Sequence, residues 1–578
     1  MRERGQVKMN MSYKSRYHRV EPIKKINIEQ SMYDLVMSEN ADNMDCYYAS
    51  YLGSKLTFAQ LKIDTDNLAS ALFQDGVKNG DLIGVCLLTT PEVASALLAI
   101  NKIGAVSFWL DAGLGINNIL NYIQEYNLKI LIVFEALAPM VLEIISETKL
   151  EKVIVVPINP LIKNSECVIK DKRLIYYSDY ILSAIDIQVE VAPYNHTKPS
   201  IIVQSSGSTG KSKSIVHTDY NFNAAVEKMC YCDLPLYKKK RALVCAPPWV
   251  IYGLVNSIYS GLVLGIETVY TIQPKEEMIY THLGSFDFVY GVPVYYRFLY
   301  NKMKQLERST NDKDIERLKE IRNYLNKISV FISGGDKISE DELISWQLMF
   351  EIPIINGYGN NEVTGAAIVS PRFANKVGAI GIPMYGNFVK TFDVETGCML
   401  SDGEIGELYI SSNSLFRGYL GNEEETEKIK CVVNDIDWVR TGDLAYIDSE
   451  GYVFLKGRTR RLIINKLGYK VSPNSVENVI QNCMYVQECV VVGVEIADND
   501  MVPIAFIELL DDYKGKKDVL HVIEELCKQK LKIYEIPRFF SEIDKIPHKE
   551  NGGKQDFLLL ENLAKDIVYH QNKTQIKK

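Results

Sequence analysis

The sequence contains no apolar run long enough to cross a membrane. In the most apolar stretch, residues 83–100, Pro91 and Glu92 interrupt the hydrophobic residues, whereas a spanning helix needs about 20 consecutive apolar residues. The N-terminus also lacks a signal-peptide pattern, because no apolar segment follows its first basic residues. We therefore expect a cytoplasmic protein with no membrane span.

An excess of positive charge is also missing. The chain has 65 Lys and Arg residues against 73 Asp and Glu residues, and its formal net charge is −8. Proteins that bind nucleic acids usually carry a basic face. The composition therefore argues against a nucleic-acid partner.

The cysteines do not form the pattern of a disulfide framework or a zinc site. There are 11 of them, an odd number, and they are scattered through apolar segments such as residues 85–87, as buried thiols are. Cys230 and Cys232 are the closest pair, but no second Cys or His pair follows at the spacing of zinc ligands.

The alternation of elements predicts an α/β protein. With 578 residues the chain is too long for one compact core. We expect a helix over 58–73 with Thr57 as its N-cap, a strand over 82–88 and a helix over 91–103. Further apolar strands follow near 130–134, 153–156, 243–246, 267–272, 288–290 and 330–333. Short strands separated by helices predict parallel sheets covered on both faces.

The residue composition changes twice outside this region. Residues 1–27 are rich in Lys and Arg with little to bury, and we expect a mobile tail. Beyond Gly381, closely spaced turn residues predict a compact β region. The basic segment Thr459-Arg460-Arg461 then precedes a small α/β segment. We therefore place the domains at 1–27, 28–458 and 459–578.

A loop suited to phosphate follows the apolar run 201–203. Residues 205–213 read Ser-Ser-Gly-Ser-Thr-Gly-Lys-Ser-Lys. Small residues let backbone amides approach an anion, hydroxyls add donors, and lysines add positive charge. The loop is not a P-loop, because Ser205 stands where G-x-x-x-x-G-K-[ST] requires its first glycine. A flexible Gly/Ser connection is the alternative interpretation of this stretch alone.

Four more motifs follow in a specific order. They are Tyr358-Gly359-Asn360-Asn361-Glu362, Thr441-Gly442-Asp443, Gly457-Arg458 and Gly552-Gly553-Lys554. Taken singly, Tyr358 also fits a core tyrosine, Asp443 a turn, and Lys554 a solvated loop lysine. Together with the loop, they resemble the adenylate-forming superfamily: acyl- and aryl-CoA synthetases, firefly luciferase and the adenylation domains of nonribosomal peptide synthetases. The resemblance runs from about Tyr33 to Asp556.

The resemblance implies a fold and an activity. The fold is a large N-terminal domain of two doubly wound sheets and a small β region, hinged to a small mobile α/β domain. The activity uses ATP and Mg²⁺ to convert a carboxylic acid into an acyl-AMP with release of pyrophosphate. The acyl group then passes to a thiol, that of CoA or of phosphopantetheine.

The resemblance also implies the residues that bind ATP. They are Ser206, Gly207, Ser208, Thr209, Gly210 and Lys213 in the phosphate loop, Gly334, Gly335 and Asp336 along the edge of the base, Tyr358, Gly359 and Asn361 near the adenine and phosphates, and Asp443 and Arg458 at the ribose.

Catalysis is assigned by the same resemblance to Lys554, Thr209 and Glu362. Lys554 is expected to reach the acyl carboxylate and the α-phosphate, where it steadies developing charge. Glu362 is the expected Mg²⁺ ligand, because a carboxylate is a hard oxygen donor. Arg460 is the expected hinge residue, about which the small domain rotates between the two half-reactions.

Some positions depart from the usual pattern of the family. Ser212 and Ser214 replace Pro and Gly, Asn361 replaces Thr, and Arg460 stands where Asp or Lys is more common. The loop that would line the thiol channel with Gly468 is one residue longer than usual. A nucleotide-binding relative without turnover is therefore an alternative function.

The acid pocket is expected at Trp249, Val250, Tyr252 and Gly357. This segment has no Asp to pair with the ammonium of an α-amino acid, and burying an unpaired ammonium would be costly. An aryl or aliphatic acid is the expected substrate, although Trp249 and Tyr252 also fit packing residues away from the pocket. The expected acceptor is CoA, with a separate carrier protein as the alternative, because no carrier domain follows Lys554.

Overall fold

The computed structural model describes residues 21–159, 171–185, 187–205, 213–271, 286–336, 338–372, 376–464, 470–497, 500–548 and 555–576. The chain divides into two compact units. The large unit comprises Met1–Val389, Ile410–Val439 and Glu450–Val453, and the small unit comprises Lys390–Tyr409, Arg440–Ser449 and Phe454–Lys578. The domain boundaries expected after residues 27 and 458 stay predictions.

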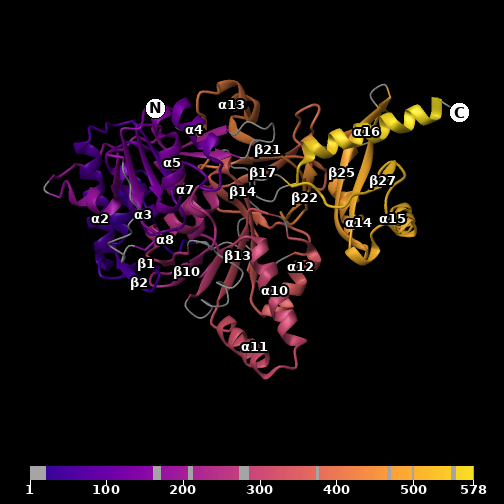
Figure 1. Ribbon diagram of the computed structural model, residues 1–578, viewed down its shortest axis with the longest axis horizontal. Helices are drawn as coiled ribbons and strands as arrows, with labels where there is room; N and C mark the ends of the chain where they lie inside the picture. Colours follow the sequence, from indigo (N-terminus) through magenta and orange to yellow (C-terminus); the bar gives the residue numbers. More distant parts are fainter. Residues whose placement is uncertain are drawn as a thin grey trace. The chain divides into compact units, whose positions relative to one another are not determined.

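An eight-stranded sheet forms one layer of the large unit (Figure 1). Its order is β19-β9-β8-β4-β3-β5-β6-β7; the strands from β8 to β7 run parallel, and β9 pairs antiparallel with both β8 and β19. The strands are β3 (Leu82–Cys86), β4 (Val106–Trp109), β5 (Ile130–Phe134), β6 (Lys152–Val156), β7 (Leu174–Tyr176), β8 (Pro199–Ser205), β9 (Lys213–Thr218) and β19 (Gly418–Tyr419).

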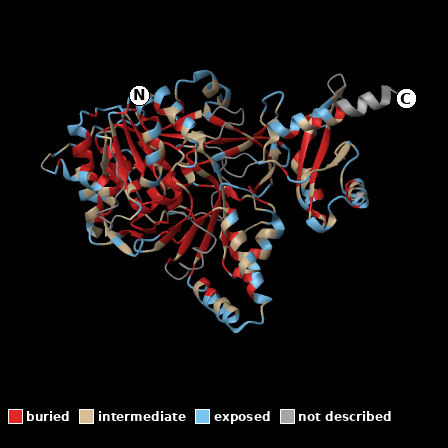
Figure 2. Ribbon diagram, viewed as in Figure 1, coloured by how far each residue is buried: buried red, intermediate tan, exposed pale blue. Residues whose placement is uncertain are grey.

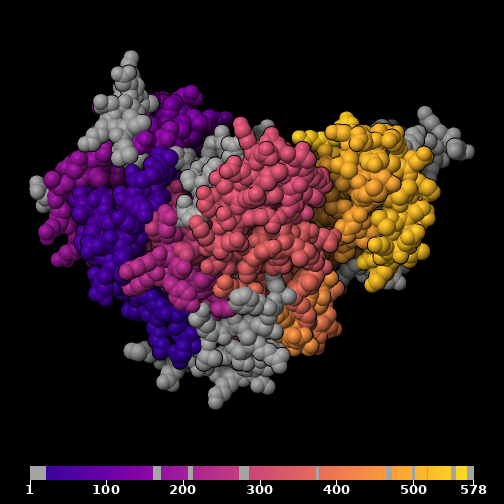
Figure 3. Space-filling view, turned by 90° about the horizontal axis from the view of Figure 1, so that it is seen from below, coloured from indigo at the N-terminus to yellow at the C-terminus, as the bar shows by residue number. Residues whose placement is uncertain are grey.

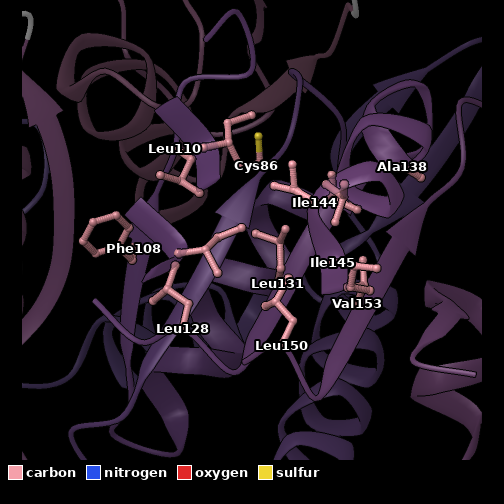
Figure 4. Packing of buried hydrophobic residues seen from close by; sticks show 14 of the residues in the cluster. Cys86, Phe108, Leu110, Leu128, Leu131, Ala138, Ile144, Ile145, Leu150 and Val153 are labelled. Atoms are coloured by element: carbon pink, nitrogen blue, oxygen red, sulfur yellow. The ribbon is translucent and has the colours of Figure 1, made fainter. Parts of the chain in front are cut away.

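Both faces of this sheet are buried. On one face, Leu131 and Val153 join an apolar cluster with Ile144, as Figure 4 shows. The alternate residues Ile132 and Ile154 are also fully buried, as expected for parallel strands covered on both sides. The helices of this half are α1 (Met32–Glu39), α2 (Phe58–Gln74), α3 (Glu92–Lys102), α4 (Ile116–Glu125), α5 (Ala138–Ile144), α6 (Tyr177–Leu182) and α7 (Asp219–Cys230).

A nine-stranded sheet forms the other layer of the large unit, in the order β16-β15-β14-β13-β12-β10-β11-β1-β2. Its run from β14 to β1 is parallel. The pairing of β1 with β11 joins segments far apart in the chain, and Figure 3 shows indigo and magenta segments adjoining on the surface of this unit. The strands are β1 (Tyr47–Tyr51), β2 (Ser54–Thr57), β10 (Arg241–Val244), β11 (Glu267–Val269), β12 (Phe288–Gly291), β13 (Val330–Gly334), β14 (Ile354–Asn360), β15 (Gly365–Val369) and β16 (Ile382–Pro383).

Aromatic side chains fill the core between this sheet and its helices. Tyr296 and Trp346 from the helices pack with Phe331 of the sheet in one buried cluster. The helical segments of this half are η4 (Tyr252–Tyr259, π-helical), α8 (Ser260–Leu264), α10 (Pro293–Glu307), α11 (Asp312–Leu325) and α12 (Glu340–Phe350).

A five-stranded sheet confirms the β region expected beyond Gly381. Its order is β17-β18-β21-β20, and β22 also pairs with β21. The elements are β17 (Phe388–Phe392), β18 (Gly406–Ser411), β20 (Lys430–Val433), β21 (Ile436–Ile447), β22 (Val453–Arg458) and the helix α13 (Glu423–Ile429).

The C-terminal part of the small unit is a three-stranded sheet between helices (Figure 2). Val490 and Val492 face Leu560, whereas Val491 faces Val476 on the opposite side, so successive residues of one strand serve two cores. The elements are β23 (Ile463–Ile464), β24 (Lys470–Val471), α14 (Pro473–Gln481), β25 (Val486–Ala497), β26 (Asp500–Leu509), α15 (Lys517–Lys530), β27 (Phe539–Glu542) and α16 (Phe557–Ile576).

The early elements expected from the sequence are confirmed. The helix α2 begins at Phe58, and the Thr57 hydroxyl caps it by accepting a hydrogen bond from the Gln60 amide at 3.2 Å. The strand and helix expected over 82–88 and 91–103 are β3 and α3. Among the described residues, no helix has the length and apolarity needed to span a bilayer.

Candidate functional site

The expected phosphate loop connects two antiparallel strands. Ser205 at the end of β8 is the register partner of Lys213 at the start of β9, and the Lys213 amide donates to Ser205 Oγ at 3.3 Å. The loop thus emerges at the carboxyl end of β8, where ligands of open α/β sheets usually bind. The expected phosphate ligands Ser206, Gly207, Ser208, Thr209 and Gly210 lie outside the described residues.

The Lys213 ammonium is held by two partners in the large unit. It forms an ion pair with Glu425 of α13 and lies 4.6 Å from the centroid of the Tyr419 ring. Hydrogen bonds from Lys213 and Lys428 lower the pKa of Glu425 to about 2. Glu425 therefore stays charged, and its ion pair engages the Lys213 ammonium in this structure.

Glu362 lies on a short turn that directly follows β14. The turn, η5 (Asn361–Val363), begins at Asn360, whose Oδ1 accepts from the Val363 amide at 3.0 Å. The half-buried Glu362 accepts a hydrogen bond from the Tyr419 hydroxyl, with 2.8 Å between that oxygen and Oε1. Asn361 lies on the same turn.

The surroundings of Glu362 fit Mg²⁺ bound together with phosphates. Throughout the part of the chain that the structure describes, no three His, Cys, Asp or Glu residues form a group able to hold a metal. Mg²⁺ commonly takes one or two carboxylates and completes its shell with waters and substrate phosphates. A single carboxylate beside Tyr419, whose ring also contacts the Lys213 that ends the phosphate loop, suits that coordination.

Glycines line the ends of two adjacent strands. Gly334 of β13 pairs in parallel with Gly357 of β14, and Tyr358 and Gly359 follow directly. A Cβ on Gly359 would lie 1.8 Å from the Gly365 carbonyl oxygen of β15, so only glycine fits there. The close approach of β15 therefore requires glycine next to Tyr358, and Gly335 and Asp336 follow β13.

The expected acid-pocket residues lie close to these strand ends. The Tyr252 hydroxyl is 3.1 Å from both the Gly291 and the Ile332 carbonyl oxygens, which can share its hydrogen. A Cβ on Gly334 would lie 3.3 Å from the Tyr252 ring. Tyr252 thus packs beneath Gly334, while Trp249 and Val250, both half-buried, precede it.

In the small unit, Asp443 and Arg458 form an ion pair between β21 and β22. Arg458 Nε lies 2.7 Å from Asp443 Oδ1; the Asp443 side chain is 9% exposed and that of Arg458 is 63% exposed. Asp443 lies inside a strand, where Gly442 has a φ of +71°. The Thr441 hydroxyl accepts from the Asp443 amide at 3.1 Å and fixes the bend.

Three expected residues of the small unit are described in part or not at all. Arg460 lies on the turn η6 (Thr459–Arg461), and its side chain is outside the described part. Lys554 and Gly468 lie outside the described residues altogether. The roles of all these site residues stay predictions.

Two residues beside the site were not expected from the sequence. Tyr419 contacts both Lys213 and Glu362, and Glu425 pairs with Lys213. The pairing of β19 with β9 brings Tyr419 to this place. Glu425 belongs to an acidic run at the start of a helix, a pattern typical of solvated residues, so sequence reasoning had no signal for it.

Comparison with known families supports the resemblance drawn from the motifs. The family described as AMP-binding enzyme matches residues 38–420, and the AMP-binding enzyme C-terminal domain matches residues 475–553.

Individual proteins resemble the chain over most of its length. It is 26% identical over 518 residues to the putative acyl–CoA ligase YdaB of Bacillus subtilis (strain 168), covering 88% of this chain and 94% of that protein. It is 25% identical to the 4-coumarate–CoA ligase-like 8 of Arabidopsis thaliana, covering 89% and 87%. The crystal structure of the anthranilate CoA ligase AuaEII with anthranoyl-AMP superposes with a TM-score of 0.78 at 20% identity, covering 95% of this chain and 100% of that one.

Proposed function

The chain belongs to the AMP-binding enzyme family, and from that premise we propose that it is an AMP-forming acid–thiol ligase acting with CoA. A carboxylate oxygen of the acid attacks the α-phosphorus of ATP, the bond to pyrophosphate breaks, and an acyl-AMP forms. The sulfur of CoA then attacks the acyl carbon, and the carbon–oxygen bond to AMP breaks. The products are a thioester, AMP and pyrophosphate.

The observation that carries this proposal is the extent of the family match. The matched residues 38–420 include both the phosphate loop and the Glu362 turn. Lys213 and Glu362 also contact the same residue, Tyr419. A cationic group and a hard oxygen ligand this close suit the phosphates of ATP and their cation.

The candidate site residues have proposed parts in the first step. Lys213 offsets the charge of the departing pyrophosphate, and Glu362 is the protein ligand of Mg²⁺, which when bound neutralises phosphate charge. Tyr358 stacks on adenine, and Asp443 accepts hydrogen bonds from the ribose hydroxyls beside Arg458. Lys554 steadies the attacking carboxylate and the α-phosphate.

The proposed substrate is an aryl or aliphatic acid and not an α-amino acid. The pocket segment Trp249 to Tyr252 carries no charge that could pair with an ammonium. The names of two similar proteins refer to aromatic acids: one is an anthranilate CoA ligase and the other a 4-coumarate–CoA ligase-like protein. Both facts favour an uncharged acyl group.

The test is acid-dependent exchange of labelled pyrophosphate into ATP, over a panel of aryl, fatty and α-amino acids. We expect exchange with at least one aryl or fatty acid and none with α-amino acids. Each active acid is then offered with CoA or with a phosphopantetheine-bearing carrier protein. Tight ATP binding without exchange over the whole panel would favour the non-catalytic alternative instead.

A further inference from the structure

A short segment, residues 412–419, runs along the turn that carries Glu362. The Phe416 amide donates to the Glu362 carbonyl at 2.9 Å, and the Ser414 hydroxyl donates to the Val363 carbonyl at 2.9 Å. Thr364, whose φ is +54°, donates through its hydroxyl to the Ser414 carbonyl. These bonds hold a turn that contains a strained left-handed residue.

A buried lysine of α7 also contacts the segment 412–419. Lys228 Nζ donates to Ser414 Oγ at 2.8 Å, and both side chains are almost fully buried. The backbone of the Glu362 turn is therefore fixed by contacts that involve no nucleotide.

Tyr419 ends this segment and fixes the Glu362 side chain. Its hydroxyl donates to Glu362 Oε1 at 2.8 Å, and the residue is only 8% exposed. Its own position is set by the register of β19 on β9, opposite Ile215, and by its amide, which donates to Thr426 Oγ1 at 2.9 Å. A donor held this firmly restricts the rotation of the carboxylate that accepts from it.

The ring of Tyr419 contacts the lysine that ends the phosphate loop. Lys213 Nζ lies 4.6 Å from the ring centroid, within the range of a cation–π interaction. One side chain thus contacts the proposed cation ligand with its hydroxyl and the proposed phosphate ligand with its ring.

We propose that Tyr419 is a positioning residue of the nucleotide site, whose hydroxyl orients the Glu362 carboxylate for the cation that accompanies ATP. This inference rests on the proposed function. Groups that hold a metal ligand set its orientation before the metal arrives, and removing them typically weakens metal affinity by about 10- to 100-fold. Tyr419 has this relation to Glu362.

The experiment measures binding of an ATP analogue with a non-cleavable α,β-bridge by calorimetry, once with Mg²⁺ and once with EDTA. In the wild-type protein Mg²⁺ is expected to strengthen binding. Tyr419→Phe keeps the ring beside Lys213. Its gain in affinity on adding Mg²⁺ should be about 10-fold smaller than that of the wild type, while its affinity in EDTA stays unchanged.

Tyr33→Phe is the matched control. The Tyr33 hydroxyl also donates to a carboxylate, Asp66 Oδ1, at 2.7 Å, but in the helices α1 and α2. This variant should keep the wild-type response to Mg²⁺. The double variant Tyr419→Phe with Glu362→Gln should respond to Mg²⁺ as Glu362→Gln alone does, because the hydroxyl acts through that carboxylate.

The outcomes distinguish a failure of this inference from a failure of the proposed function on which it rests. If the wild type binds the nucleotide and Tyr419→Phe responds to Mg²⁺ as the wild type does, the proposed role of Tyr419 is overturned. The ligase proposal is then unaffected. If Tyr419→Phe lowers the Mg²⁺ response further in a protein that already carries Glu362→Gln, Tyr419 does not act through Glu362 and the inference is overturned. No nucleotide binding by the wild type overturns the proposed function and this inference together.

Discussion

Glu362 in the large unit accepts a hydrogen bond from a neutral phenol, whereas Asp443 in the small unit is paired with the guanidinium of Arg458. The phenol of Tyr419 donates to the first carboxylate without neutralising its charge. The guanidinium neutralises the second and leaves it able to accept hydrogen bonds from hydroxyls. This difference supports the proposed roles, a cation at Glu362 and an uncharged ligand, such as a ribose, at Asp443.

The largest expected effect belongs to a residue that should act in only one of the two half-reactions. Lys554→Ala should slow acyl-AMP formation by about 10³-fold, because a charge that stabilises the transition state is lost. Thioester formation from a supplied acyl-AMP should be largely spared. Pyrophosphate exchange and a thioester assay measure the two steps, with the exposed Lys545→Ala as control. An equal loss in both steps would contradict the expected rotation of the small domain.

Glu362→Gln tests the large-unit side of the comparison. Removing the carboxylate charge should lower pyrophosphate exchange by about 10²-fold. The affinity for the non-cleavable ATP analogue should fall only when Mg²⁺ is present. A loss of equal size in EDTA would mean that Glu362 is not the cation ligand.

Asp443→Asn tests the small-unit side. The amide cannot compensate Arg458 and accepts weaker hydrogen bonds, so affinity for the analogue should fall by about 10-fold. Because a ribose needs no cation, calorimetry should give the same loss in Mg²⁺ and in EDTA. A loss confined to Mg²⁺ would reverse the assignment of the two carboxylates.

Glu425→Gln tests the ion pair that holds Lys213. Releasing the lysine from a partly exposed pair should tighten binding of the analogue by about two- to fivefold. Glu424→Gln is the control, because Glu424 pairs with Lys428 of the same helix. Weaker binding by Glu425→Gln would show that Glu425 positions Lys213 and does not compete with phosphate for it.

Lys228 should make the stability of the fold depend on pH. Burial lowers the pKa of Lys228 to about 7, whereas an unfolded lysine has a pKa of about 10.4. Between these values the unfolded chain binds the proton more tightly, so the free energy of unfolding falls as the pH drops from about 10 to 7.

Lys228→Met should remove this part of the pH dependence. Urea unfolding of both proteins at pH 7 and pH 9 measures the difference, which is expected to be a few kcal/mol. Equal pH dependence in the two proteins would show that Lys228 stays charged in the fold.

Much of the fold follows from local pattern. The apolar run Ile130–Phe134 is buried throughout as β5, and Thr57 caps α2 as expected. The strand β9 is different: no strand was expected over Lys213–Thr218, which becomes a strand because it pairs with β8. A hairpin therefore carries the phosphate loop, which the loop residues themselves do not specify.

The sequence by itself determined the family, the α/β architecture and the candidate residues, because ordered motifs and hydrophobic periodicity are properties of neighbouring positions. Tertiary structure alone decided how those residues are supported. Tyr419 reaches Glu362 across 57 positions of the chain, and Lys213 reaches Glu425 across 212. No local pattern contains these contacts, because the pairing of β19 with β9 and the turn after β14 create them. Whether a carboxylate meets a phenol or a guanidinium is decided by neighbours that folding brings close.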